Sequence, residues 1–132
     1  MSTPLSNVVD RSVVDFPDGV TKKVRLAGVR VLDGTTGREV FLTGPVDMAR
    51  YHTIPFTPIT NAQGRTIPVY GVSLKVTEVD GQPTYRDWNL ISKRALTFLK
   101  PFLENGDYLK YVFSVTPVGA PPTTDYQIVP LP

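Results

Sequence analysis

The chain of 132 residues is predicted to fold as a mainly β domain with a single helix. Residues 66–79 have the clearest strand pattern, because apolar and polar side chains alternate along them. Thirteen prolines and ten glycines divide the chain into short elements. Only the segment that begins at Ser92 places its apolar residues at helical spacing. These three observations together predict several short strands around one helix.

Two strands joined by a tight turn are expected near the start of the chain. Residues 21–32 are rich in β-branched side chains, and Gly28 is expected to mark a bulge where the alternation changes phase. The sequence Asp-Gly-Thr-Thr-Gly at 33–37 is typical of a turn, and residues 38–43 resume the strand pattern. The sequence therefore predicts a hairpin in this region.

Residues 44–65 interrupt the strand pattern. They contain three prolines and two glycines, and we expect a long loop, which in a small domain is often functional. Residues 66–79 follow as the predicted third strand. After a turn at 80–83, residues 84–90 are expected to form a short returning strand.

The single helix is predicted over residues 93–104. Ser92 precedes it, and its hydroxyl is well suited to an N-cap. Asn105 and Gly106 are typical of a left-handed helix stop. Pro101 lacks a backbone N–H and is expected to kink the helix or to start a second turn. The apolar stripe of the helix consists of Ala95, Leu96, Leu99, Phe102 and Leu103.

The order of elements favours one known architecture. Residues 108–116 and 124–129 are predicted as the last strands, so the order is strand, strand, strand, helix, strand, strand. This is the order of the OB-fold, a partly open Greek-key barrel. We expect residues 21–132 to form a mainly β, five-stranded, OB-like, partly open barrel with one helix between strands three and four, after an N-terminal arm over 1–20. A β-sandwich with an incidental helix and a meander sheet packed on a helix are the alternatives.

A pattern of short motifs covers roughly residues 84–131. Its matching parts are Trp88, the helix that begins at Ser92, and the closing strand with Thr124 and Tyr126. The pattern resembles small phage and prophage single-stranded DNA-binding proteins of the OB type. The resemblance implies a nucleic-acid binder that acts in replication or recombination, in the cytoplasm of the host cell.

Basic residues are concentrated in the middle of the chain. The net charge is only +2, but residues 21–100 hold 12 basic and 6 acidic residues, whereas both ends are net acidic. Clustered Lys and Arg attract polyanions. A protein that binds single strands also needs flat rings, because stacking one base on an aromatic side chain contributes about 1–3 kcal/mol and tolerates any sequence.

The candidate nucleic-acid-binding residues therefore combine cations with rings from this basic region. In an OB-fold, strands two and three and the neighbouring loops form the binding face. Tyr70 is expected in the core instead, because it shares its side of the strand with Val72 and Leu74. The alternative role of Trp88 is to anchor the core, and that of Phe56 is to pin the loop. The candidates are Arg38, Arg50, Tyr51, Phe56, Arg65, Lys75, Tyr85, Arg86 and Trp88.

The sequence argues against catalysis, metal binding and membrane insertion. The chain has no cysteine, which excludes disulfides, thiolate metal sites and thiol catalysis. His52 is the only histidine and has no nucleophile motif beside it. No apolar run is long enough to cross a bilayer, and the first ten residues lack the pattern of a secretion signal. We expect a protein that is not an enzyme, has no cofactor or metal, and does not contact membranes.

Three classes of function remain, and a protein-interaction module is the third of them. The first is sequence-independent binding of single-stranded DNA, or of RNA, since discrimination between them depends on one or two contacts to the 2′-hydroxyl. The second is a structural or assembly protein of a phage or virion, such as a head or tail component, because abundant proline and short strands suit packing against neighbours. An exposed edge of a partly open barrel would allow a homo-oligomer.

Overall fold

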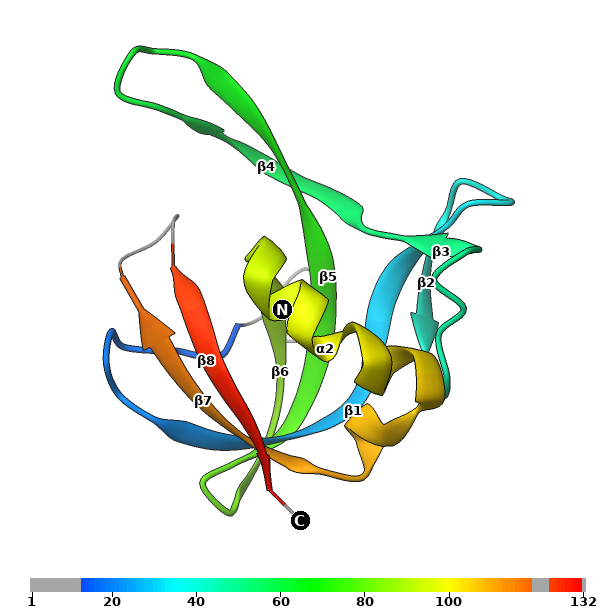
Figure 1. The fold of residues 1–132 in the computed structure, drawn as a ribbon, viewed down its shortest axis with the longest axis vertical. Coiled ribbons are helices and arrows are strands. Elements are labelled where there is room, and N and C mark those ends of the chain that lie inside the picture. Colours follow the sequence, from blue (N-terminus) through cyan, green and yellow to red (C-terminus); the bar gives the residue numbers. More distant parts are fainter. Residues whose placement is uncertain (1–12, 120–123, 132) are drawn as a thin grey trace, which may run out of the picture.

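Eight strands and one α-helix make up the computed structural model, which describes residues 13–119 and 124–131 (Figure 1). The helix α2 (Lys93–Asn105) stands between the sixth and seventh strands and is followed by a short 3-10 helix, η1 (Asp107–Leu109). The strands are β1 (Lys22–Asp33), β2 (Glu39–Leu42), β3 (Tyr51–His52), β4 (Ile54–Thr60), β5 (Thr66–Val79), β6 (Gln82–Leu90), β7 (Val112–Val118) and β8 (Asp125–Leu131).

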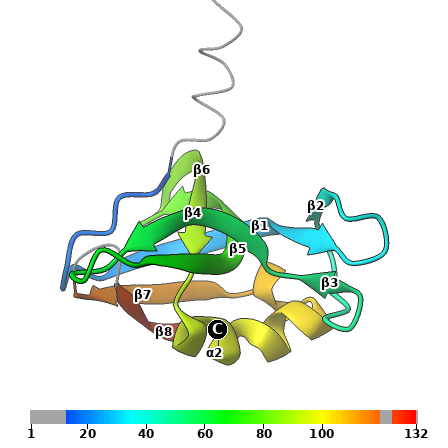
Figure 2. The ribbon, with the colours of Figure 1, turned by 90° about the horizontal axis from the view of Figure 1, so that it is seen from above.

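Strand β1 is the centre of the sheet, because it pairs antiparallel with β2, β3, β5 and β7. The longest path of pairing runs β4-β5-β1-β7-β8, and β6 pairs with β5. Within the described part of the chain no pairing joins β6 to β8, so the sheet stays open. Seen from above, β6 lies on one side of the molecule and α2 on the other (Figure 2).

The expected mainly β class with one helix is confirmed, but the prediction of five strands with the helix after the third is wrong. Residues 44–65, expected to be a loop, contain β3 and β4. Strand β4 pairs with β5 in spite of Pro55 and Pro58, because an edge strand needs its N–H groups on one side only. The returning strand expected over 84–90 is the longer β6.

The predicted strand over 108–116 also begins too early. Its first residues belong to η1, and β7 starts at Val112. Tyr108 is fully buried there, and its hydroxyl donates a hydrogen bond to the carbonyl oxygen of Gly44 at 2.8 Å. Burial raises the pKa of Tyr108 to about 12. Tyr108, which was predicted to lie in this strand, therefore lies in η1 and contacts a residue that is distant in the sequence.

Local signals in β1 and α2 are confirmed. The pairing of β1 with β5 shifts register between Leu26 and Gly28, where the bulge was expected. The Ser92 hydroxyl accepts a hydrogen bond from the backbone N–H of Ala95 at 3.2 Å. Gly106 ends α2 with a φ of 83°. The helix continues through Pro101 to Asn105.

The core lies between the inner faces of the sheet and α2. The helix buries three apolar residues of one stripe, and full burial of a leucine contributes roughly 1.5–3 kcal/mol. Strands β1, β5, β6 and β7 each bury at least two apolar residues in this core. The largest fully buried side chains include Trp88, Phe113, Leu74, Leu90, Leu99 and Leu103.

Residues 13–20, the described end of the predicted N-terminal arm, run from β6 to β7. The N–H of Val14 donates to the Asp87 carbonyl at 2.9 Å, and the N–H of Gly19 donates to the Pro117 carbonyl at 2.9 Å. The ring of Phe16 contacts rings on both β6 and β8. This segment therefore spans the open side of the sheet. Residues 1–12 of the predicted arm lie outside the described residues.

No helix in the described part of the chain is both long and apolar enough to cross a membrane.

Gly71 is expected to tolerate no side chain. A Cβ at this position would collide with the carbonyl oxygen of Leu90, which belongs to backbone and has little room to move. We expect Gly71→Ala to lower the free energy of unfolding by about 1–3 kcal/mol in a denaturant titration. Gly44→Ala is the matched control, because nothing lies within 4 Å of a Cβ there. Equal stability of the two variants would contradict this assignment.

Candidate nucleic-acid interface

The side of β1, β5 and β6 that faces away from the core carries polar and aromatic residues. Residues that stand directly opposite each other in an antiparallel ladder point to the same side. The register places Arg30 opposite both Phe41 and Ser73, and Lys75 opposite Asp87. We call this surface the sheet face; it comprises Arg30, Phe41, Ser73, Lys75, Tyr85, Asp87 and Asn89.

A buried ion pair lies under the exposed ring of Tyr85 on the sheet face. The Nζ atom of Lys75 is 2.7 Å from Oδ1 of Asp87, and Lys75 is only 5% exposed. The same Nζ lies 4.2 Å from the centre of the Tyr85 ring, a cation–π contact. Tyr85 itself is 58% exposed. The charge of Lys75 is thus compensated within the protein, and the lysine supports the ring.

A cleft of about 310 Å³ opens beside this pair and is lined by residues of β1, β2, β4, β5 and β6. Arg30, Phe56 and Asn89 are among its lining residues, and the hydroxyl of Ser73 donates to Oδ1 of Asn89 at 2.9 Å. No ion pair joins Arg30 to another described residue within 4.0 Å. Phe41 of β2 stands beside Arg30 of β1 and is 41% exposed.

Arg30 and Phe41 were not among the sequence candidates. A usable signal existed for Arg30: once the alternation has changed phase at Gly28, it places Arg30 on the same side as Lys75. The position of Phe41 depends on the pairing of β2 with β1. The same pairing places the Phe41 ring over Gly28, so a Cβ at residue 28 would collide with this ring.

Arg50, Tyr51 and Arg38 lie at the far end of β1. Arg50 donates two hydrogen bonds to the Asp33 carboxylate, from Nε at 3.3 Å and from Nη2 at 3.1 Å. The hydrogen bond from Arg50 holds the pKa of Asp33 below its ordinary value. The Arg50 guanidinium also lies 5.1 Å from the centre of the half-buried Tyr51 ring. Arg50 therefore ties the loop before β3 to β1, whereas Arg38 is exposed in the turn before β2.

Trp88 and Arg86, two of the predicted site residues, do not belong to the sheet face. Trp88 is 2% exposed, and its ring lies 5.3 Å from that of Phe16 and 5.2 Å from that of Tyr126. It cannot stack on a base in this arrangement. Arg86 stands opposite Val76 in the ladder and points to the side opposite Lys75.

The nine candidates therefore do not gather on one surface. Lys75, Tyr85 and Phe56 lie on or beside the sheet face. Arg65 is exposed in the turn between β4 and β5, away from the others. The physical reason is that neighbouring residues of a strand point to opposite sides, so closeness in sequence does not bring side chains together.

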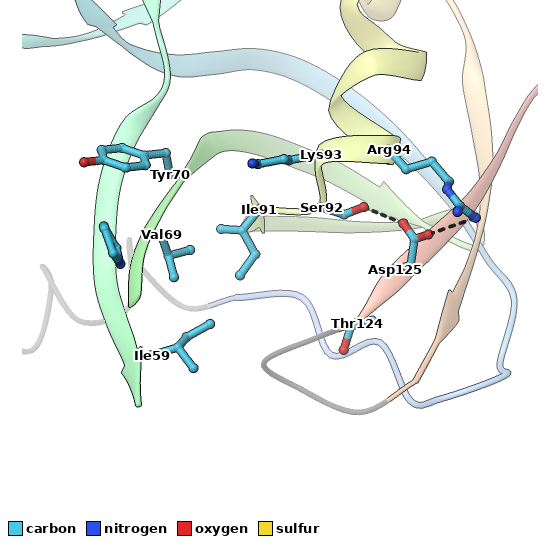
Figure 3. A pocket seen from close by; sticks show the side chains of 10 residues that line it. Ile59, Val69, Tyr70, Ile91, Ser92, Lys93, Arg94, Thr124 and Asp125 are labelled. Atoms are coloured by element: carbon cyan, nitrogen blue, oxygen red, sulfur yellow. Dashed lines mark hydrogen bonds and ion pairs between the residues drawn. The ribbon is translucent and has the colours of Figure 1, made fainter. Parts of the chain in front are cut away.

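A second cleft, about 590 Å³ in volume, lies between the β4–β5 hairpin (residues 54–70), the start of α2 and the start of β8. We call it the hairpin cleft (Figure 3). Tyr70 lies on its β5 wall, and Lys93 points from α2 toward that wall (Figure 3). The lining residues are Ile59, Pro68, Val69, Tyr70, Ile91, Ser92, Lys93, Arg94, Thr124 and Asp125.

Tyr70 is 54% exposed, so its predicted place in the core is wrong. Its alternation with Val72 is real, but β5 leaves the core at Gly71. From there toward its start, β5 pairs with β4 alone in a hairpin that projects from the body (Figure 1). None of the described elements buries Tyr70 on this part of the strand.

The acidic residue of the hairpin cleft is engaged within the protein. The hydroxyl of Ser92 and the N–H of Tyr126 donate to Asp125, and Arg94 lies 3.5 Å from it. The hydrogen bond from Ser92 is the main reason why the pKa of Asp125 is lowered. Among the residues that the structure describes, Lys93 has no ion-pair partner within 4.0 Å.

The described residues contain no group of three or more His, Asp or Glu side chains that could hold a metal ion. Comparison of the chain with protein-family models, with curated proteins and with solved structures gave no match.

The network around Asp125 predicts a pH dependence of stability. A carboxylate whose pKa is lowered by folding stabilises the protein above its unfolded pKa and loses this effect as the pH falls through its folded pKa. We expect Asp125→Asn to lower the free energy of unfolding by about 1 kcal/mol at pH 7. The difference from wild type should shrink below the ordinary value of 3.8. Urea titrations between neutral and acidic pH measure it.

Asp15→Asn is the control, because Asp15 is exposed. A difference between Asp125→Asn and wild type that stays constant down to the lowest pH would contradict the assignment.

Proposed function

We propose that this protein is a single-stranded DNA-binding protein of the OB type, acting without sequence preference in replication or recombination. Five of its strands support the fold assignment. Taken in chain order, β1, β5, β6, β7 and β8 pair as 3-2-1-4-5, with the helix between the third and fourth. This is the arrangement of an OB barrel that has not closed between strands three and five. Strands β2, β3 and β4 then elaborate the connection between the first two barrel strands.

The proposed binding surface is the sheet face. In OB-folds, strands two and three and the loops beside them bind oligonucleotides. Here those strands are β5 and β6, and the sheet face lies on both, next to the elaborated connection. The basic middle of the chain, with 12 basic against 6 acidic residues over 21–100, supplies the strands and loops concerned.

The observation that carries the proposal is the exposed ring of Tyr85 above the buried Lys75–Asp87 pair. Burying an ion pair has a desolvation cost, so the stability that the pair contributes is seldom a sufficient reason for its presence. In this place the pair holds an aromatic ring toward solvent in a fixed position. A ring held in advance loses little entropy when a base stacks on it. Arg30 beside the cleft adds a cation for a phosphate.

A structural or assembly protein of a phage or virion is the second candidate. The observation that favours it is the β4–β5 hairpin, which projects from the body (Figure 1). Ile67 and Tyr70 of this hairpin are exposed. Neither candidate includes a catalytic step or a bound cofactor. We place the protein in the cytoplasm of the cell, where single-stranded DNA arises during replication.

Salt titration tests the first function. Fluorescence polarisation of a labelled oligo-dT should report binding at low salt and release at high salt. Each single-strand phosphate contact contributes about −0.7 to the slope of log affinity against log salt concentration. We expect a slope of about −1.4 or steeper, which corresponds to two or more contacts. The absence of binding at low salt, with self-association in sedimentation, would favour the assembly protein.

Substitutions test the sheet face. We expect Tyr85→Ala to weaken oligo-dT binding by about 1–3 kcal/mol, because one stacking contact is lost. Arg30→Ala should reduce the magnitude of the salt slope by about 0.7, because one phosphate contact is lost. Tyr85→Phe keeps the ring and should bind like wild type. Lys100→Ala removes an exposed cation from α2, on the other side of the molecule from β6 (Figure 2), and should also have no effect.

If Tyr85→Ala and Arg30→Ala both bind with wild-type affinity and slope, the sheet face is not the contact surface.

A further inference from the structure

We infer that the hairpin cleft is a second nucleotide-binding subsite, which holds one base against Tyr70 and the adjoining phosphate at Lys93. The inference rests on the proposed binding of single strands and extends it beyond the sheet face. Two observations carry it: the exposed Tyr70 ring at the outer edge of one wall of the cleft, with its hydroxyl directed outward, and a cation that extends toward that wall from the other (Figure 3).

The ring of Tyr70 is available and is held on a stiff backbone. Tyr70 stands opposite Pro55 in the hairpin ladder, and Pro68 precedes it by two residues. Proline fixes one backbone dihedral, so little conformational entropy is lost when a ligand orders this segment further. More than half of Tyr70 is exposed, so its ring does not contribute to the buried core.

The charge of the hairpin cleft favours an anion. Its carboxylate, Asp125, already accepts hydrogen bonds from Ser92 and from the Tyr126 N–H and lies beside Arg94. Lys93 is left with no ion pair among the described residues, so the cleft presents a positive charge on the wall that α2 forms. A purely apolar ligand would contact the Tyr70 ring but would leave the charge of Lys93 without a partner in the ligand.

The size and the lining of the cleft fit one nucleotide. Its volume of about 590 Å³ lies within the range of roughly 300–1,000 Å³ typical of small-molecule sites. Ile59, Val69 and Ile91 give the cleft an apolar lining that suits the apolar part of a nucleotide (Figure 3). The position also fits the proposed fold, since the hairpin belongs to the same connection that flanks the sheet face.

A length series of oligonucleotides tests the inference. Single-stranded DNA sites on OB-folds span about 4–16 nucleotides, so oligo-dT of about 5 and about 15 nucleotides separates one subsite from two. Wild type should bind the longer oligonucleotide more tightly. Tyr70→Ala combined with Lys93→Ala should weaken binding of the longer one roughly ten-fold or more. The same variant should bind the shorter one within about two-fold of wild type, because the sheet face is intact.

Matched controls separate the subsite from a general loss of charge or of folding. Tyr70→Phe keeps the ring, Lys93→Arg keeps the charge, and Lys100→Ala removes another exposed cation from the same helix. All three should bind both oligonucleotides like wild type. Lys93→Glu alone, a substitution at an exposed position, should weaken only the longer oligonucleotide.

The outcomes distinguish this inference from the proposed function. Wild-type binding of both oligonucleotides by the double variant and by Lys93→Glu would overturn the subsite and leave the function standing. Equal loss for both lengths would also overturn it, because the cleft would then not be separate from the sheet face. Failure of the wild-type protein to bind either oligonucleotide would overturn the proposed function and this inference with it.

Discussion

The close approach of β6 to β5 at Gly71 is the constraint on which both candidate surfaces depend. The carbonyl oxygen of Leu90 occupies the space that a Cβ of residue 71 would need. From Gly71 onward, β5 lies between β1 and β6 and forms the sheet face; before Gly71 it pairs only with β4 and forms a wall of the hairpin cleft. A single long strand thus serves a packed sheet and a projecting hairpin, and the change between them falls at the residue without a side chain.

Charges in this protein are used in two ways. Asp33, Asp87 and Asp125 each lie beside a specific cation and accept or support hydrogen bonds that tie separate elements together. Their partner cations, which include Arg50 and Lys75, therefore stabilise contacts within the fold. Arg30 and Lys93 make no such ion pair among the described residues, and each lines a cleft together with an aromatic residue, Phe56 and Tyr70 respectively. We therefore assign ligand recognition to these two cations rather than to the paired ones.

The packing of rings at the open side of the sheet explains why Trp88 is buried. Strands β6 and β8 form no ladder in the described part of the chain, and their rings, Trp88 and Tyr126, meet edge to face at 5.2 Å. Phe16, from the segment before β1, packs against both. Aromatic pairs of this kind contribute about 0.5–1.5 kcal/mol beyond the area that they bury. Trp88 thus joins three distant segments of the chain, and this packing withdraws its ring from any ligand.

Local patterns in the sequence determined most of the elements: the long alternation of β5, the bulge at Gly28, and the start and stop of α2 at Ser92 and Gly106. These signals are local, because backbone dihedrals and hydrogen bonds within a few residues produce them. Tertiary structure alone decided which faces are covered. Tyr70 and Val72 share one side of one strand, yet only Val72 is buried, because alternation defines the side of a residue and not what packs on it. The site residues were predictable only in part for the same reason: Tyr85 faces solvent and Trp88 does not because segments far away in the sequence cover one side of β6.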